Sequence, residues 1–171
     1  RIWDFSSVIT RFMKAITDTK EVVDIFEIVP DILDSQNPET LKMSKGYIVF
    51  RGVSFKYNLG QEILSNFNLD IKPGERVGIV GHSGAGKSTI TKLLLRFNDI
   101  TSGSITIDGQ DIRNVTQDDL RSAISYVPQE PILFHRPIRE NINYGKPNAS
   151  EQEIVDVAKK AHANEFISKL P

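Results

Sequence analysis

Hydrophobic and polar positions along this 171-residue chain follow helical spacing first and strand spacing later. In residues 1–29, apolar side chains recur at intervals of three, four and seven with polar residues between them. This spacing predicts one long amphipathic helix or two shorter ones. The polar, proline-containing stretch 30–45 predicts a linker. From residue 46 the pattern alternates with a period of two and Gly52 breaks its phase, which predicts a strand with a bulge over 46–57.

The rest of the chain alternates between strand-like and helix-like segments. The pattern predicts a second alternating strand at 64–71, an apolar strand at 76–80, a helix at 89–97, a strand with a tight turn at 104–109, a short helix at 118–121, a buried strand at 123–127 and an irregular segment at 131–148. Ser150 followed by Glu153 is a capping box, which predicts that a last helix begins there. The expected fold is α/β, with an antiparallel layer before the core strand at 76–80.

Composition narrows the class of protein. Apolar residues make up 39% of the chain and charged residues 25%, as in a folded globular protein. The formal net charge of −1 gives no broad basic field for nucleic acid. Without cysteine, disulfides and thiolate metal sites are excluded. No signal peptide or bilayer-spanning apolar run is visible. The chain starts at Arg1 and stops just after a helical stretch, so we expect it to be a fragment.

The strongest chemical signal is a phosphate-binding pattern, G-x-x-x-x-G-K-S/T, matched at every position. It comprises Gly81, His82, Ser83, Gly84, Ala85, Gly86, Lys87 and Ser88, and Thr89 follows. Glycines allow the backbone amides to turn inward toward a phosphate chain. The helix that follows directs its positive dipole end to the same place. Lys87 adds a full charge for the β- and γ-phosphates, and Ser88 offers a hydroxyl to Mg²⁺.

Several stretches besides this loop carry a resemblance to a known family. They are 53–57 (VSFKY), 101–105 (TSGSI), 107–112 (IDGQDI), 126–130 (YVPQE) and 138–142 (IRENI). With them, residues 46–170 resemble the nucleotide-binding domain of ABC transporters of the exporter type. The resemblance implies a phosphate-loop NTPase core with an antiparallel β layer, preceded by a long amphipathic helix. It also implies three regions: 1–29 as an extension from a membrane domain, 30–45 as a linker, and 46–171 as the N-terminal part of the nucleotide-binding domain.

Two site residues outside the loop come from this resemblance. It implies that Tyr57 stacks on adenine and that the Gln129 amide reaches Mg²⁺ near the γ-phosphate. By this resemblance, the catalytic residues would be Lys87 and Gln129. Mg²⁺ would be bound by Ser88 and Gln129, and Thr89 would support the phosphate end. From the residues alone, Tyr57 is better interpreted as an edge-strand tyrosine packed on its neighbours. The alternative for Gln129 is a polar residue that caps a strand after a proline. Residues 1–29 likewise fit a simple packing or dimerisation helix.

The hydrolytic half of the family's site is not found in the sequence. There is no Leu-Ser-Gly-Gly-Gln signature, no apolar strand ending in Asp-Glu and no later switch histidine. Asp108 ends an apolar run, but a glycine turn follows it, so we do not assign it to Mg²⁺. We therefore expect an incomplete domain whose isolated chain hydrolyses ATP negligibly.

The expected function is the ATP-binding part of an exporter that couples ATP binding and hydrolysis to transport. Its cofactors would be ATP and Mg²⁺, and its place the cytoplasmic face of a membrane. The expected partners are the transmembrane domain of the same transporter and a second nucleotide-binding domain, not nucleic acid. Two alternatives remain: a soluble ABC ATPase outside transport, and an inert nucleotide-binding fragment.

Overall fold

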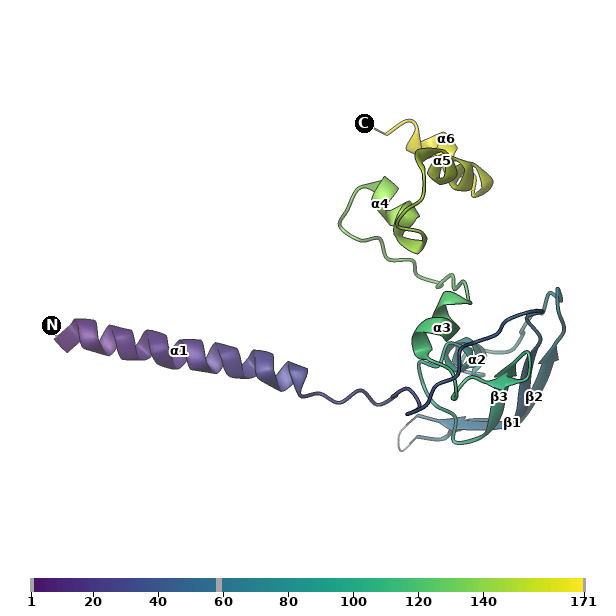
Figure 1. The fold of residues 1–171 in the computed structure, drawn as a ribbon, viewed down its shortest axis with the longest axis horizontal. Coiled ribbons are helices and arrows are strands. Elements are labelled where there is room, and N and C mark those ends of the chain that lie inside the picture. Colours follow the sequence, from purple (N-terminus) through teal and green to yellow (C-terminus); the bar gives the residue numbers. More distant parts are fainter. Residues whose placement is uncertain (1, 58–59, 171) are drawn as a thin grey trace. The chain divides into compact units, whose positions relative to one another are not determined.

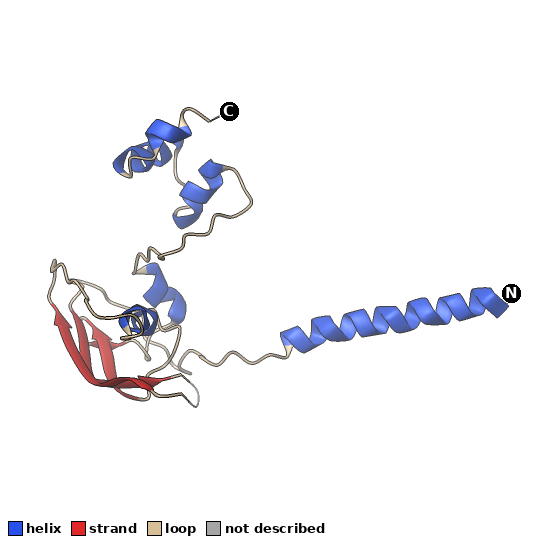
Figure 2. Ribbon diagram, turned by 180° about the vertical axis from the view of Figure 1, so that it is seen from behind, coloured by secondary structure: helices blue, strands red, loops and turns tan. Residues whose placement is uncertain are grey.

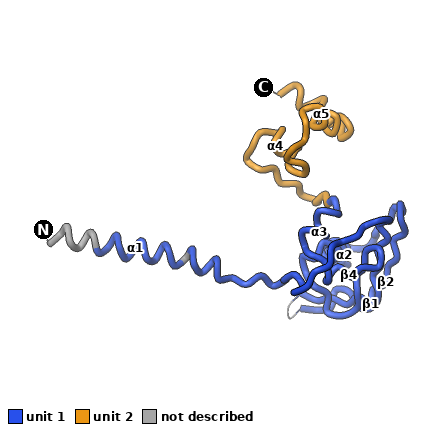
Figure 3. The backbone as a smooth tube through the Cα atoms, viewed as in Figure 1, with its two compact units in different colours: residues 1–125 blue, residues 126–171 orange. Residues whose placement is uncertain are grey.

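The computed structural model describes residues 2–57 and 60–170, without the side chains of residues 2–8 and 21. The chain forms two compact units, residues 1–125 and residues 126–171 (Figure 3). The first unit holds α1, the sheet and the helices α2 and α3, and the described residues of the second unit form helices and loops (Figure 2).

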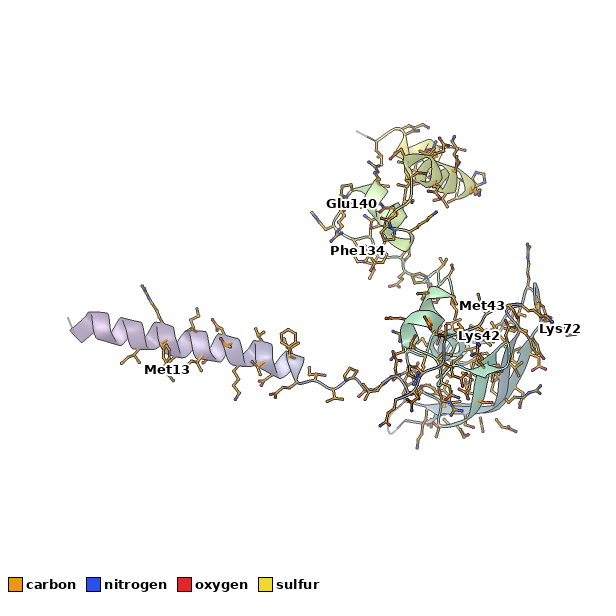
Figure 4. All side chains as sticks on the ribbon, in the orientation of Figure 1. Met13, Lys42, Met43, Lys72, Phe134 and Glu140 are labelled. Atoms are coloured by element: carbon orange, nitrogen blue, oxygen red, sulfur yellow. The ribbon has the colours of Figure 1, made fainter. Side chains whose placement is uncertain are left out.

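The N-terminal pattern forms one helix, α1 (Ile2–Phe26), as the first of the two predicted possibilities. Phe12, Ile16 and Val23 line a shallow apolar groove along it. Met13 is also largely exposed on this helix (Figure 4). Among the described residues, no helix has both the length and the apolar character needed to cross a bilayer.

The sheet is antiparallel, as predicted, and among the described residues it consists of four strands in the order β2-β1-β3-β4, of which Figure 1 labels β1, β2 and β3. They are β1 (Ile48–Lys56), β2 (Glu62–Ile71), β3 (Ser102–Ile107) and β4 (Gln110–Asp111). Phe50 pairs with Leu69 on one side and with Ile105 on the other. The predicted irregularity at Gly52 is confirmed, because the register shifts between Phe50 and Val53 and Gly52 has a φ of 55°.

One hydrophobic core joins the sheet to α2 (Lys87–Leu94) and α3 (Gln117–Ser122). Alternation along β1 and β3 directs Phe50, Val53 and Ile105 into it, and the spacing of α2 adds Ile90 and Leu93. The fully buried side chains are Phe50, Val53, Leu93, Ile105, Ile107, Val115 and Leu120. The core thereby fixes α2, which begins at the phosphate loop, against the sheet.

A close backbone crossing supports the bulge in β1. Gly103 in β3 has a φ of 88°, and a Cβ there would lie 2.4 Å from the Arg51 carbonyl oxygen and 2.5 Å from that of Gly52. Only glycine fits this crossing without a shift of the two strands.

The linker lies along the sheet unit rather than free of it. The Glu39 N–H donates to the Asn114 carbonyl at 2.7 Å. Lys42 and Met43 lie on this part of the linker (Figure 4), and the Lys42 N–H donates to Gln110 Oε1 at 2.6 Å. Further on, backbone N–H groups of residues 44–47 donate to the Asp108 carboxylate over 2.7–3.0 Å.

Two predicted strands are wrong. Residues 76–80 and 123–127 are irregular, and Val80 and Val127 are 93% and 87% exposed. Only Ala123 and Ile124 at the start of the second segment are half-buried. A parallel strand needs hydrogen-bonded neighbours, and no described strand pairs with either segment. Apolar composition alone therefore does not make them strands here.

The second unit consists of short helices. They are α4 (Ile138–Ile142), the 3-10 helix η1 (Asn143–Gly145), α5 (Glu151–Lys160) and α6 (Asn164–Ile167). The prediction of an irregular segment at 131–148 is wrong in part, because α4 and η1 lie within it. The predicted capping box is confirmed, with the Ser150 N–H donating to Glu153 Oε2 at 2.8 Å and the Glu153 N–H to Ser150 Oγ at 3.3 Å.

Candidate functional site

The phosphate loop is seated where the sheet meets α2. Gly86 is the N-cap residue of α2 in the left-handed conformation, with a φ of 82°. A Cβ on Gly86 would lie 3.0 Å from Ile63 Cγ2 in β2. Gly81 is less restricted, because only packing limits it: its Cβ would lie 3.2 Å from that of Ala85. Backbone conformation therefore favours glycine at Gly86, and the surroundings of both glycines are close-packed.

The backbone around the start of α2 is arranged to receive an anion. In the part of the chain that the structure describes, the N–H groups of Gly84, Gly86, Lys87 and Ser88 donate to no protein acceptor. The first turn of α2 contains no acidic residue. Free N–H groups and the positive end of the helix dipole favour negative charge at this point.

Lys87 places its charge within the loop itself. Its Nζ donates to the Gly81 carbonyl at 2.7 Å and to the His82 carbonyl at 2.8 Å. The Ala85 N–H also donates to the His82 carbonyl, at 3.2 Å. His82 thus takes part in the loop through its backbone, and both His82 and Ser83 are exposed.

The two hydroxyl residues after the lysine have different environments. Ser88 is exposed, and among the described residues its Oγ has no hydrogen-bond partner, so it is available to a ligand. Thr89 is buried on the core side of α2. The role of Thr89 in supporting the phosphate end stays a prediction, and the burial of its side chain does not favour that role.

Tyr57 has features of both of its predicted roles. Its ring packs edge-on against Phe55, with centroids 4.7 Å apart and an interplanar angle of 84°. It remains 38% exposed and lines a polar pocket of about 290 Å³ together with Phe97 and Asp99. No residue of the phosphate loop lines that pocket. Stacking of adenine on Tyr57 therefore stays a prediction.

Gln129 lies in the second unit, four residues after the first unit ends, and is exposed. Lys87 and Ser88 belong to the first unit, and the predicted role of Gln129 at Mg²⁺ stays a prediction. Asp108 takes part in a structural contact, since its carboxylate accepts the linker amides 44–47. Pattern reasoning missed this contact, because a carboxylate that binds backbone amides leaves no periodic signal.

Comparison with known proteins places these features in one family. A profile described as ABC transporter matches residues 64–171, well over half of the chain. The chain thus belongs to the ABC transporter family, and its sheet and phosphate loop are part of that family's ATP-binding region. It is also similar in fold to a solved bacterial Atm1-family ABC exporter with ATP bound, with a TM-score of 0.86 and 41% identity over 93% of this chain and 28% of that one.

Two relatives illustrate the range of similar proteins. The heavy metal tolerance protein of Schizosaccharomyces pombe is 44% identical over 98% of this chain and 20% of its own length. An ATP-dependent lipid A-core flippase of Desulfotalea psychrophila is 45% identical over 97% of this chain and 29% of its own length. The chain therefore spans between a fifth and a third of these relatives and covers only part of the nucleotide-binding domain.

Proposed function

We propose that this chain supplies the phosphate-gripping part of the ATP site in an ABC exporter. The observation that carries the proposal is the start of α2, where unpaired N–H groups and the Lys87 ammonium converge on one loop. Such a site holds the triphosphate of ATP by many short contacts, and phosphoryl transfer depends on this positioning and charge neutralisation. The names of the relatives, a flippase and an exporter with ATP bound, support ATP-driven transport as the parent activity.

The residues present fit both ATP and Mg²⁺. Gly84 and Gly86 have φ values of 81° and 82°, so side chains would strain the backbone that lines the phosphate position. The exposed Ser88 hydroxyl is a hard oxygen donor of the kind that Mg²⁺ prefers, and Mg²⁺ takes its other ligands from phosphates and water. Mg²⁺ would neutralise phosphate charge there, while Gln129 would add an amide oxygen. No described group of three or more acidic or histidine side chains offers another metal site.

In the parent protein, we assign the remaining predicted parts by the same reasoning. Residues 1–29 would extend from a transmembrane domain, 30–45 would link it to the nucleotide-binding domain, and 46–171 would form the first part of that domain. A second nucleotide-binding domain would complete the site at the cytoplasmic face of the membrane. The sequence shows no general base and no signature, so the isolated chain would bind ATP weakly or not at all and hydrolyse it negligibly.

The proposal is tested by removing the ammonium of Lys87 in the full-length protein. Lys87→Ala deletes a charge-assisted phosphate contact and should weaken MgATP binding by about 2–5 kcal/mol. Equilibrium binding of a fluorescent ATP analogue, with ATP competition, measures this change.

Lys92→Ala is the matched control, because Lys92 lies on the same helix, is exposed and comes five residues after Lys87. The affinity of the Lys92→Ala protein for MgATP should stay within a factor of about two of the wild-type affinity, as for a surface change away from the ligand. Equal affinities for Lys87→Ala and wild type would contradict the assignment of the loop to phosphate. Nucleotide binding without ATP-dependent transport would favour the soluble ATPase or the inert fragment.

A further inference from the structure

The end of α2 that lies away from the phosphate loop contains an arginine in an unusual backbone conformation. Arg96 has a φ of 50°, and its N–H donates to the Leu93 carbonyl at 3.0 Å while the Phe97 N–H donates to that of Lys92 at 2.9 Å. This is the Schellman ending of a helix, in which the left-handed residue is usually glycine. For a residue with a side chain this conformation costs about 1–2 kcal/mol. A compensating contact of the side chain is therefore required.

The Arg96 guanidinium makes that contact, and the side chain is buried, with an exposed fraction of 5%. Its Nη2 donates to the Leu33 carbonyl in the linker at 2.9 Å, and its Nη1 lies 3.8 Å from the Asp34 carboxylate. Outside the linker, Arg96 Nε donates to the Asp99 carboxylate at 3.0 Å, and Nη1 donates to the Val115 carbonyl at 3.4 Å. A buried arginine thus joins the linker directly to the end of α2, and removing one partner of such a group is costly.

Two side chains of α3 complete the same arrangement. Gln117 donates to Asp34 Oδ1 from its backbone N–H at 3.0 Å and from Nε2 at 3.1 Å. Arg121 donates to Gln117 Oε1 at 2.8 Å and to the carbonyls of Leu95 and Arg96 at 3.2 and 3.0 Å. A cation on the last carbonyls of α2 stabilises that helix end. We call the four residues Asp34, Arg96, Gln117 and Arg121 the latch.

We propose that the latch couples the linker to nucleotide binding by positioning α2 from its far end, with Arg96 as the positioning residue. α2 has eight residues and so is about 12 Å long, and its first residues carry the phosphate-binding amides and Lys87. A short helix held at its C-terminus by the linker and filled at its N-terminus by phosphate transmits a shift between the two ends. This inference rests on the proposed function, because it assigns the loop to ATP.

Coupling of this kind is reciprocal. If an attached linker favours the α2 position that binds MgATP, then MgATP must favour the attached linker by the same factor. A linker that pulls on Asp34 would lower the affinity for nucleotide, and bound nucleotide would resist the pull. The latch would give the parent protein a route between its helix extension and the ATP site that does not pass through Gln129.

Asp34→Ala opens the latch at the linker, and Asp31→Ala is its matched control. Both are linker aspartates, but among the described residues Asp31 has no hydrogen bond or ion pair. Hydrogen exchange followed by mass spectrometry is measured on residues 32–39 and 87–96, with and without MgATP. Asp34→Ala should speed exchange in both segments and weaken MgATP binding at least ~5-fold. In wild type, MgATP should slow exchange in 32–39. Without nucleotide, the Asp31→Ala protein should exchange as wild type in both segments.

Arg96→Gly is a second variant that separates coupling from simple loss of structure. Glycine adopts a φ of 50° without strain, so the helix ending is kept while the guanidinium is lost. We expect fast exchange in 32–39 that no longer responds to MgATP. If either variant frees the linker while exchange in α2 and the affinity stay at wild-type values, the coupling is overturned.

The two proposals fail separately. All of these measurements use the full-length protein, and if the full-length wild type binds no nucleotide, the proposed function is lost. Exchange alone then decides the latch: faster exchange in 87–96 when Asp34 is removed supports positioning of α2, and unchanged exchange refutes it. Circular dichroism of each variant confirms that the fold is retained, and Gln117→Ala replaces a variant that unfolds.

Discussion

Asp108 shows how a single carboxylate sets the course of the linker. It occupies a tight turn with a φ of 48° and accepts the backbone N–H groups of residues 44–47. These N–H groups, that of Lys45 foremost, hold the pKa of Asp108 well below its usual range. The folded protein therefore favours the ionised carboxylate more strongly than the unfolded chain does.

This lowered pKa predicts how stability depends on pH. The stability contributed by Asp108 is present above the ordinary aspartate pKa of about 4 and is lost as the pH falls toward the lower pKa of the folded state. Asp108→Asn should lower the denaturant midpoint at pH 7, and the difference from wild type should shrink progressively below pH 4. Asp31→Asn is the control. A difference that stays constant down to pH 2 would contradict the assigned cause.

At the scale of elements, the crossing of β1 and β3 is the most constrained contact. A methyl group at Gly103 would overlap the Arg51 and Gly52 carbonyls, and the backbone there has a φ of 88°. Gly103→Ala should therefore destabilise the protein by about 2–4 kcal/mol. Gly109→Ala is a useful comparison, since that glycine also has a positive φ of 86° but open space at its Cβ, so only the strain applies. Urea denaturation measures both, and equal losses would mean that the crossing is looser than described.

Elements whose hydrogen bonds are made within a short stretch of sequence could be predicted. Elements that need a hydrogen-bonded partner from a distant part of the chain could not. α1, α3 and the capping box at Ser150 follow from helical spacing and caps, and the strands β1 and β2 pair with each other across one turn. Residues 76–80 are as apolar as a strand, but pairing depends on neighbours that composition does not reveal. The phosphate loop was found because its motif is local, whereas the latch joins Asp34 to Arg96 across 62 positions of sequence.

The irregular state of 76–80 has a direct experimental signature. Backbone amides without ladder hydrogen bonds exchange quickly, whereas those of a central strand are protected. In this 171-residue chain, we expect amides of 76–80 to exchange at least ~100-fold faster than those of β1. In the full-length protein this difference should fall if further strands cover the segment. Equal protection in the 171-residue chain would show that 76–80 already forms a strand.

At the scale of the whole molecule, the chain divides into two units between residues 125 and 126. The segment 126–133 has no regular secondary structure and is exposed throughout. Limited proteolysis with a protease of broad specificity should therefore cut first in 126–133, since exposed irregular segments are the preferred sites. Mass spectrometry of the earliest products identifies the cut. A first cut in 39–47, where the linker is held by Asp108 and Gln110, would contradict the attachment of the linker.

Lys87 has one further consequence for the energetics of the loop. Its ammonium already donates hydrogen bonds to the backbone carbonyl oxygens of Gly81 and His82, at 2.7 and 2.8 Å. On the proposed function, an incoming triphosphate would compete with these carbonyls, so recruitment of the lysine would be an exchange of partners rather than the gain of a new one. The released oxygens of Gly81 and His82 would then need water, and the net affinity records only the difference between the two arrangements.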